Sequence, residues 1–209
     1  MTPARTLVLA SSNAGKLREL VDLTHALPLP LPLQVRPQSD WQVADAVEDG
    51  LSFIENALIK ARHAARASGQ AALADDSGLV VPLLGGAPGI HSARYGGVHG
   101  DDTRNNQTLL ARLQPLRQPG QPVRGQFVCV LAVVRHAGDP LPLICQGVWH
   151  GEILDAPRGT QGFGYDPLFW VPDQQMSSAE LPRALKNRLS HRAQAMQQLQ
   201  QQLADFFID

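Results

Sequence analysis

The residues with the clearest capacity for chemistry are two adjacent carboxylates, Asp75 and Asp76, which are followed by Ser77 and Gly78. They come at the end of an apolar stretch typical of a β-strand, and Gly78 indicates a turn directly afterwards. Because neighbouring strand residues point to opposite faces, we expect the two carboxylates to have different roles. One could coordinate Mg²⁺ or accept a proton from water, and Ser77 could donate to a phosphate. The alternative for so short a pattern is an Asx-turn, in which one acid caps local amides.

A second signal lies near the N-terminus, where an apolar run ending at Ala10 leads into the turn Ser11-Ser12-Asn13-Ala14-Gly15-Lys16 and then into an amphipathic helix. A strand, a small-residue turn, a lysine and a helix together favour phosphate binding, because backbone N–H groups, the helix dipole and the ammonium all attract an anion. The turn is not a Walker A loop, since Ala10 replaces its first glycine and Leu17 follows the lysine. The alternative is an ordinary turn with a capping Asn or Ser and a solvated lysine.

The segment Gly162-Phe163-Gly164-Tyr165-Asp166-Pro167 places two glycines around an aromatic residue. This composition lets the backbone approach a flat ligand while Phe163 offers a stacking face, and Asp166 could accept from ring N–H groups of a base. Glycine–aromatic turns also cap hydrophobic cores, and Tyr165 fits such a plug better than a ligand contact.

Three potential cations, Lys186, His191 and Arg192, accompany Ser190 at the start of a predicted helix. Cations are unfavourable beside a helix N-terminus, so their placement indicates an anion or an oxo group between them. A solvated surface cluster is the alternative.

A further acidic pair, Glu48 and Asp49, precedes the helix that begins after Ser52. Mg²⁺ favours one or two carboxylates together with substrate phosphates, so Glu48 and Asp76 form a candidate Mg²⁺ site.

The elements that must position these residues alternate between helix and strand patterns. A capping box, Ser52-x-x-Glu55, predicts the start of a helix on which Asn56, Lys60 and His63 share one face. The proline-rich segment Pro28–Pro37 is interpreted as a surface loop. The predicted helices are residues 15–26, 53–67, 101–113 and a C-terminal helix from about 190, and the predicted strands are residues 7–10, 73–76, 79–84, 127–134 and 143–149, the last two joined at 138–140. These elements predict an α/β fold with a mixed sheet.

Composition limits the function classes. A chain of 209 residues with 44% hydrophobic content is long enough for one sizeable domain. Its net charge of −1 argues against a nucleic-acid or anionic-membrane partner, and 5% aromatic residues without a basic stripe argue against RNA. The apolar run at the N-terminus is too short for a signal peptide or a membrane span, which predicts a cytoplasmic protein. Cys129 and Cys145, in apolar surroundings, are expected to behave as small hydrophobes.

Six segments together resemble the inosine triphosphate pyrophosphatases of the Ham1 type, enzymes that remove non-canonical purine nucleotides. The segments are Leu9–Lys16, Phe53–Ala57, Ala74–Leu79, Pro88–Tyr95, Gly162–Pro167 and Ser190–Arg192, and the match spans nearly the whole chain. One departure is Ser11-Ser12-Asn13, where the family commonly has Thr-Gly-Asn.

The resemblance implies hydrolysis of ITP, dITP and XTP to the monophosphate and pyrophosphate, with Mg²⁺, by a homodimer. It implies one domain over residues 1–209, an elongated mixed sheet with flanking helices and two lobes around a central substrate cleft. It also implies that Asp76 accepts the proton of the attacking water and that Glu48 and Asp76 hold the metal. The substrate contacts that it implies are Ser11, Ser12, Asn13, Ala14, Gly15 and Lys16 at the phosphates, with Lys60 and Ser77, and Phe163, Gly164, Tyr165, Asp166, Lys186, His191 and Arg192 around the base.

Two other functions stay open. A pyrophosphatase of modified or pyrimidine nucleoside triphosphates would share the N-terminal strand and turn, although the segment 163–166 with His191 and Arg192 favours a purine. A non-catalytic nucleotide-binding or RNA-binding protein is the other. For a purine substrate, donors from His191 or Arg192 facing the 6-oxo group would disfavour adenine, which carries an amino donor there. Rejection of GTP must depend on its 2-amino group, for which the sequence indicates no residue.

Overall fold

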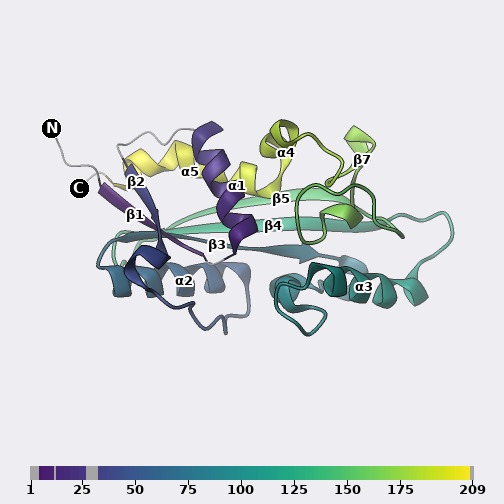
Figure 1. Ribbon diagram of the computed structural model, residues 1–209, viewed down its shortest axis with the longest axis horizontal. Helices are drawn as coiled ribbons and strands as arrows, with labels where there is room; N and C mark the ends of the chain where they lie inside the picture. The colour runs from purple at the N-terminus through teal and green to yellow at the C-terminus, as the bar shows by residue number, and fades with distance from the viewer. Residues whose placement is uncertain (1–4, 12, 27–32, 208–209) are drawn as a thin grey trace. The chain divides into compact units, whose positions relative to one another are not determined.

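The computed structural model describes residues 5–11, 13–26 and 33–207 (Figure 1). The chain divides into two compact units. The first unit comprises Met1–Asp76, Cys129–Gly147 and Arg192–Asp209, and the second comprises Ser77–Val128 and Val148–His191. No helix in the described ranges is long and apolar enough to cross a membrane.

A mixed sheet provides the framework, as the sequence predicts, and it has seven strands in the described residues. The strand order is β2-β1-β3-β4-β5-β6-β7. β1 pairs in parallel with both β2 and β3, whereas β5, β6 and β7 pair antiparallel. The bounds of the strands are β1 Arg5–Ala10, β2 Leu33–Pro37, β3 Ala71–Val80, β4 Val123–Val134, β5 Leu143–Ile153, β6 Phe169–Val171 and β7 Met176–Ser177.

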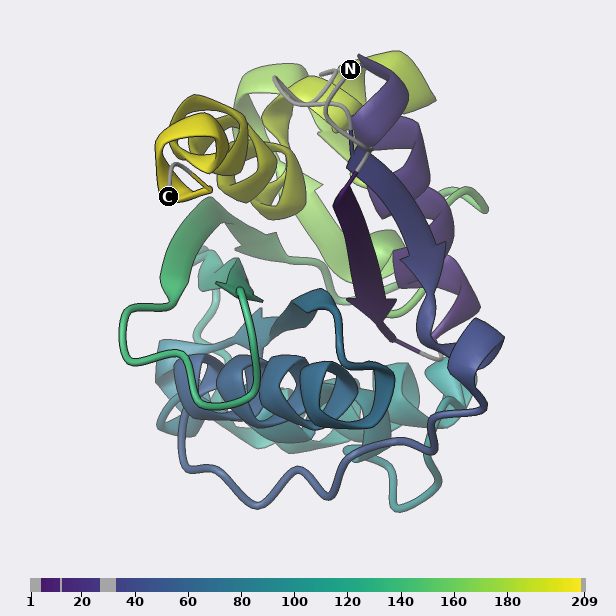
Figure 2. The ribbon, with the colours of Figure 1, turned by 90° about the vertical axis from the view of Figure 1, so that its left-hand side faces the viewer.

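Helices cover both faces of the sheet in the first unit. Figure 2 shows α2 (Phe53–Ser68) on the face opposite to α1 (Ala14–Ala26) and α5 (His191–Phe206). α2 begins as the capping box predicts, because Ser52 Oγ accepts a hydrogen bond from the Glu55 N–H at 3.2 Å. In the second unit α3 (Asp102–Leu113) is capped by Asp101, and a short helix, α4 (Arg183–Leu189), precedes α5.

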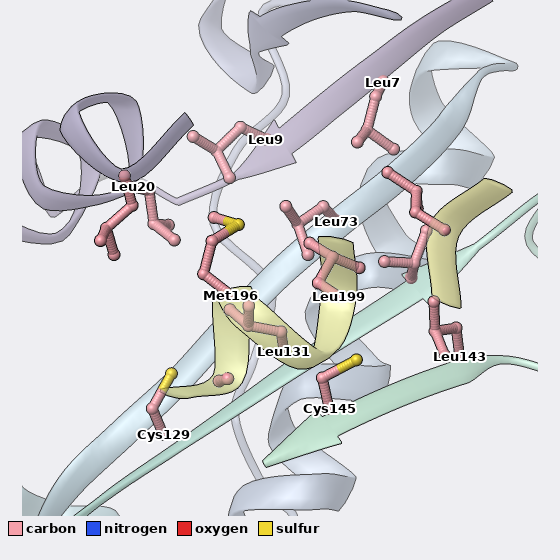
Figure 3. Packing of buried hydrophobic residues seen from close by; sticks show 14 of the residues in the cluster. Leu7, Leu9, Leu20, Leu73, Cys129, Leu131, Leu143, Cys145, Met196 and Leu199 are labelled. Carbon is pink, nitrogen blue, oxygen red and sulfur yellow. The ribbon is translucent and has the colours of Figure 1, made fainter. Parts of the chain in front are cut away.

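The core of the first unit fills the face covered by α1 and α5. Figure 3 shows Leu7, Leu9 and Leu73 of the strands packed with Leu20 of α1 and Met196 of α5. Leu7 pairs in register with Ala71 and Leu9 with Leu73, so alternate residues of β1 and β3 enter this core. The intervening residues, such as Val8 and Ala72, face α2. A separate core in the second unit is built around Leu79, Leu109, Phe127, Trp149 and Phe169.

Three predictions about β3 were wrong. The strand does not end at Asp76, and residues 79–84 are not a separate strand, because β3 continues to Val80 and Pro82–Leu84 form a 3-10 turn. Gly78 does not make a turn either. A Cβ at this position would lie 2.4 Å from Ser92 Oγ and 2.5 Å from the Gly89 carbonyl oxygen. Glycine is therefore needed for close packing inside a strand, not for a special backbone angle.

The interpretation of Pro28–Pro37 as a loop was wrong for its second half. Leu33–Pro37 form β2, with Pro37 opposite Leu9 at the end of the strand. β2 is an edge strand, where a proline is tolerated because one side of the strand needs no ladder hydrogen bonds. Residues 27–32 lie outside the described residues. The C-terminal helix begins where predicted, but α4 was missed, and Lys186 therefore lies within α4 and Ser190 at its C-terminal cap.

Candidate active site

Asp75 and Asp76 lie in the middle of β3 and are both almost fully buried, at 1% and 5% exposure. Because strand residues alternate, Asp75 lies on the face of Leu73, toward α1 and α5, and Asp76 lies on the face of α2. The contacts of the two carboxylates differ, and that they have different roles stays a prediction. The alternative of an Asx-turn is not formed, because both residues belong to a continuous strand.

Asp75 is fully engaged by three donors. Arg192 Nε lies 2.9 Å from Oδ2, Lys16 Nζ lies 3.0 Å from Oδ1, and the Cys129 thiol donates to Oδ2 at 3.1 Å. Arg192 also pairs with Glu19 of α1. Burial by itself would raise the pKa of Asp75, but Arg192 and then Lys16 outweigh it and hold this pKa well below the ordinary value. Asp75 is therefore an ionised anchor that ties α1 and α5 to β3.

Asp76 is only half engaged. Lys60 Nζ lies 2.7 Å from its Oδ1, while Oδ2 is buried and has no hydrogen-bond partner among the described residues. Burial raises the pKa of Asp76, and the nearby Lys60 and Lys16 do not fully offset it. A carboxylate with a raised pKa and an open oxygen is suited to accept a proton from a bound molecule.

Lys60 also contacts the second predicted metal ligand. Its Nζ lies 3.3 Å from Glu48 Oε1, so one ammonium bridges Glu48 and Asp76. Burial would lower the pKa of Lys60, but Asp76 and Glu48 raise it above the ordinary value. The ammonium is therefore charged, and the structure brings together the three residues predicted for metal and phosphate binding on this face.

The predicted polar face of α2 holds the segment that carries Glu48. Asn56 Oδ1 accepts from the Gly50 N–H at 2.9 Å, and His63 Nε2 lies 2.9 Å from the Ala44 carbonyl oxygen. Together with the Lys60 contact, these bonds attach residues 44–50 to one face of one helix at three successive positions. The polar face of α2 thus fixes the position of Glu48.

At the N-terminal turn, α1 begins at Ala14 and continues through Gly15. Asn13 Oδ1 accepts from the Lys16 N–H at 3.0 Å, and Ser11 Oγ accepts from the Asn13 N–H at 3.3 Å. The capping Asn of the alternative interpretation is present, but the solvated lysine is not, because Lys16 Nζ pairs with Asp75. Ser12 lies outside the described residues.

In the second unit, Asp166 organises the glycine–aromatic segment. Its Oδ2 accepts from the Phe163 N–H at 2.9 Å and from Lys186 Nζ at 2.7 Å, and its Oδ1 accepts from Ser178 Oγ at 2.8 Å. Lys186 Nζ also lies 5.5 Å from the centre of the Phe163 ring. Gly162 has φ +80°, and a Cβ there would lie 2.0 Å from Asp166 Oδ2. Asp166 is therefore occupied in holding Phe163 and Lys186 together.

The neighbouring residues have supporting contacts. The Gly164 N–H donates to Asp102 Oδ2 at 2.7 Å, and the Tyr165 hydroxyl donates to the Ser92 carbonyl oxygen at 2.9 Å. Tyr165 is buried in the core of the second unit, which agrees with its interpretation as a plug. His191 stacks on Phe127, with ring centres 4.8 Å apart and an interplanar angle of 13°.

The predicted site residues thus form two groups, one in each unit. In the first unit, Asp76, Lys60 and Glu48 lie on one face of β3, and Lys16 and Arg192 lie on the other. In the second unit, Phe163, Asp166 and Lys186 lie together. Ser77 follows Asp76 in the chain. Sequence reasoning missed Glu19, Cys129 and Ser178, each of which binds a buried carboxylate or guanidinium. Only Glu19 could have been found from the sequence, because it follows Lys16 by three residues and therefore lies on the same face of α1.

The described residues contain no cluster of three or more His, Cys, Asp or Glu side chains arranged to hold a metal ion. Glu48 and Asp76 nonetheless fit a hard divalent cation that takes its other ligands from water and phosphates. The open, buried Oδ2 of Asp76 is an oxygen donor of the type that Mg²⁺ prefers, and Glu48 is partly exposed beside it.

Comparisons with known proteins show the family to which the chain belongs. The Ham1 family model matches residues 7–202. A dITP/XTP pyrophosphatase of Acinetobacter baumannii (strain ACICU) is 61% identical over 198 residues, covering 95% of this chain and 94% of that protein. A dITP/XTP pyrophosphatase of Pseudomonas aeruginosa is 54% identical over 203 residues, covering 97% and 99%.

Solved structures resemble the whole fold as well. The structure of a HAM1 protein from Coxiella burnetii matches with a TM-score of 0.87 at 45% sequence identity, and the match covers 96% of this chain and 99% of that one. The sequence match and the structural match extend over nearly the whole chain, and we conclude that this chain belongs to the Ham1 family.

Proposed function

We propose that this chain is a nucleoside triphosphate pyrophosphatase that hydrolyses non-canonical purine nucleotides, namely ITP, dITP and XTP, to the monophosphate and pyrophosphate. The names of the two bacterial relatives support this substrate class. The observation that carries the proposal is the state of Asp76, a buried carboxylate with one open oxygen and a raised pKa, held beside Lys60 and Glu48.

In the proposed reaction, Asp76 accepts a proton from the water that attacks the α-phosphorus. The new P–O bond forms as the bond between the α-phosphorus and its bridging oxygen to the β-phosphorus breaks, so that pyrophosphate leaves with that oxygen. Lys16 and Lys60 offset the charge of the triphosphate, which would supply much of the rate. The first turn of α1, from Ala14 and Gly15, adds backbone N–H groups and the positive end of its dipole.

We propose Mg²⁺ as the metal and Glu48 with Asp76 as the residues that hold it. When bound, Mg²⁺ would neutralise charge on the triphosphate oxygens. Two carboxylates are a small ligand set, which fits Mg²⁺ because this ion usually keeps several waters and takes substrate phosphates as further ligands.

For the base, we propose that Phe163 stacks on the purine while Lys186 and His191 offer donors to the 6-oxo group. A purine with an amino group at this position would leave buried donors facing each other, which strongly disfavours binding. Asp166 acts through Phe163 and Lys186, because both of its oxygens already accept from protein donors. The contacts of Arg192 with Asp75 and Glu19 favour a role in holding α1.

We further propose one domain, a homodimer and a cytoplasmic location. The continuity of the family match supports the single domain. The net charge of −1 agrees with a small-molecule partner and with the expectation that the chain binds neither nucleic acid nor membrane.

The test is to incubate purified protein and Mg²⁺ with ITP, XTP, GTP, ATP and dTTP and to measure pyrophosphate and orthophosphate separately. We expect pyrophosphate from ITP and XTP and little product from ATP, GTP and dTTP. Orthophosphate would place the attack at the γ-phosphorus and contradict the mechanism. Turnover of dTTP in preference to ITP would favour a pyrimidine substrate, and nucleotide binding without product would favour a non-catalytic protein.

A further inference from the structure

The position of Lys60 has a consequence for the order in which metal and nucleotide bind. Its ammonium lies 2.7 Å from Asp76 Oδ1 and 3.3 Å from Glu48 Oε1. It therefore contacts both carboxylates to which we assign the metal. The side chain of Lys60 is 13% exposed, and that of Asp76 is 7% exposed, so water screens this contact weakly.

A divalent ion would meet this ammonium as a competitor. The two carboxylates carry two negative charges, and Lys60 already neutralises one of them. An ion bound by the same two carboxylates would have to displace the ammonium or remain beside a like charge a few ångströms away, and either requirement weakens binding. Lysine suits this role because its charge sits on a flexible four-carbon stem that can swing to another partner.

We propose that Lys60 is an internal counter-cation that competes with the metal for Glu48 and Asp76 and leaves them for a phosphate when the nucleotide arrives. This inference rests on the proposed function for the identity of the anion that draws Lys60 away. Its consequence is ordered binding: the metal binds weakly to the free protein and enters with the triphosphate, which supplies further oxygen ligands.

The open oxygen of Asp76 supports this role. Lys60 uses Oδ1 of Asp76, and Oδ2 stays buried without a partner among the described residues. The Asp75 carboxylate differs, because both of its oxygens are engaged, by Lys16, Arg192 and the Cys129 thiol. If Lys60 served only to pair with Asp76, the unpaired Oδ2 would be a cost in free energy without a function. If Lys60 holds the place of a cation that binds later, Oδ2 is an oxygen ligand available to that cation.

The experiment measures Mn²⁺ binding to the full-length protein without nucleotide, by the loss of the free Mn²⁺ signal in electron paramagnetic resonance. Mn²⁺ accepts the same oxygen ligands as Mg²⁺ and is directly visible. We expect Lys60→Gln to lower the Kd for Mn²⁺ at least about tenfold, because the carboxylates lose their competing charge. The same variant should turn over ITP more slowly, because the phosphates lose a cation.

Control variants assign the change to this site. Lys60→Arg keeps a charge beside the carboxylates and should leave the Kd close to that of the unaltered protein. Lys16→Gln removes a lysine that pairs with Asp75 and acts on Asp76 only through its charge, so it should lower the Kd by a smaller factor than Lys60→Gln does. The double variant Lys60→Gln with Glu48→Gln should lose the gain. Lys60→Met is the second neutral variant, in case Lys60→Gln does not fold, and thermal unfolding monitors each protein.

The outcomes separate this inference from the proposed function. An unchanged or higher Kd in a folded Lys60→Gln or Lys60→Met protein would overturn the counter-cation role, whatever the enzyme hydrolyses. A lower Kd in the Lys60 variants, together with an unaltered protein that releases no pyrophosphate from ITP, would support the role of Lys60 and refute the proposed reaction.

Discussion

Asp75 and Asp76 are adjacent in the chain and equally deep in the protein, but they differ in how completely they are paired. Both oxygens of Asp75 are engaged, by Arg192, Lys16 and Cys129. Asp76 has one engaged oxygen and one open oxygen. The pKa values follow this difference, since that of Asp75 lies well below the ordinary value and that of Asp76 above it. Alternation along one strand is enough to produce both environments.

The difference separates two uses of a buried carboxylate. A fully paired carboxylate holds other groups in position, because its charge is balanced and its oxygens cannot accept another proton or ligand without breaking a bond. A half-paired carboxylate keeps a cost in the folded state, and such a cost is common where a group must bind or react. The difference supports a positioning role of Asp75 toward α1 and Lys16 and the role in the reaction that we propose for Asp76.

The largest expected effect is on the reaction, from Asp76→Asn. The amide cannot accept the proton from the attacking water, so kcat for ITP should fall by about 10²- to 10⁴-fold. The free energy of unfolding should change by less than about 1 kcal/mol, because Lys60 keeps Glu48 as a partner. Pyrophosphate release and urea unfolding measure the two quantities. A folded Asp76→Asn protein with full activity would disprove the assignment.

The opposite pattern is expected for Asp75→Asn, which should reduce stability most. The variant leaves the Arg192 guanidinium buried beside a neutral amide, and breaking a buried pair in this way costs about 3–5 kcal/mol. Urea unfolding of Asp75→Asn measures the loss. The matched control is Asp40→Asn, which removes the exposed partner of Arg36 and should cost less than about 1 kcal/mol. Equal losses in the two variants would contradict the anchoring role of Asp75.

The pH dependence of stability should have opposite signs for the two residues. Asp75 has a lowered pKa when folded, so its contribution is present above the ordinary carboxyl pKa and is lost as the pH falls below about 4. Asp76 has a raised pKa when folded, so its protonated form favours the folded state. This contribution is fully present below the ordinary carboxyl pKa and is lost as the pH rises through the raised pKa.

Urea unfolding between pH 7 and pH 3 tests these signs against each asparagine variant. The stability advantage of the unaltered protein over Asp75→Asn should shrink as the pH falls below about 4. Its stability relative to Asp76→Asn should rise over the same change in pH. The same sign for both differences would show that the two carboxylates share one environment.

Local signals in the sequence predicted much of this arrangement. The capping box at Ser52 placed α2 and, through its periodicity, put Asn56, Lys60 and His63 on one face. Strand alternation predicted different roles for the two carboxylates. The error at Gly78 arose because a glycine that admits the close approach of Ser92 looks, in sequence, like a glycine that makes a turn. The contact that distinguishes them comes from residues 11 to 14 positions away.

Partners that are distant in sequence could not be predicted in the same way. Arg192 follows Asp75 by 117 residues, and Cys129 follows it by 54. Nothing in the apolar pattern around Cys129 indicates a carboxylate neighbour, because Asp75 enters from another strand. The sequence predicted Glu48 and Asp76 as metal ligands, which stays a prediction, but it did not predict the ammonium that contacts both of them, since Lys60 was interpreted as a phosphate ligand only.

The smallest predicted effect concerns the thiol donor that completes the pairing of Asp75. Cys129→Ala removes this donor and leaves a small space, which should cost about 1–2 kcal/mol in urea unfolding. Cys145 is an equally buried thiol whose pKa is raised to about 11 by burial alone, so it has no carboxylate partner to lose. The comparison between the two cysteines therefore measures the bond to Asp75 separately from the burial of a sulfur atom.

Serine at each position sharpens this comparison. A hydroxyl at position 129 can still donate to Asp75, so Cys129→Ser should be more stable than Cys129→Ala. At position 145 the sulfur accepts a long hydrogen bond from Gln202 Nε2, at 4.0 Å, but a hydroxyl proton there would point into the apolar core of the first unit, so Cys145→Ser should be no more stable than Cys145→Ala. The crossed order of the four variants would assign the stabilisation to the thiol–carboxylate bond, and the same order at both positions would reduce Cys129 to the small hydrophobe that its sequence surroundings indicate.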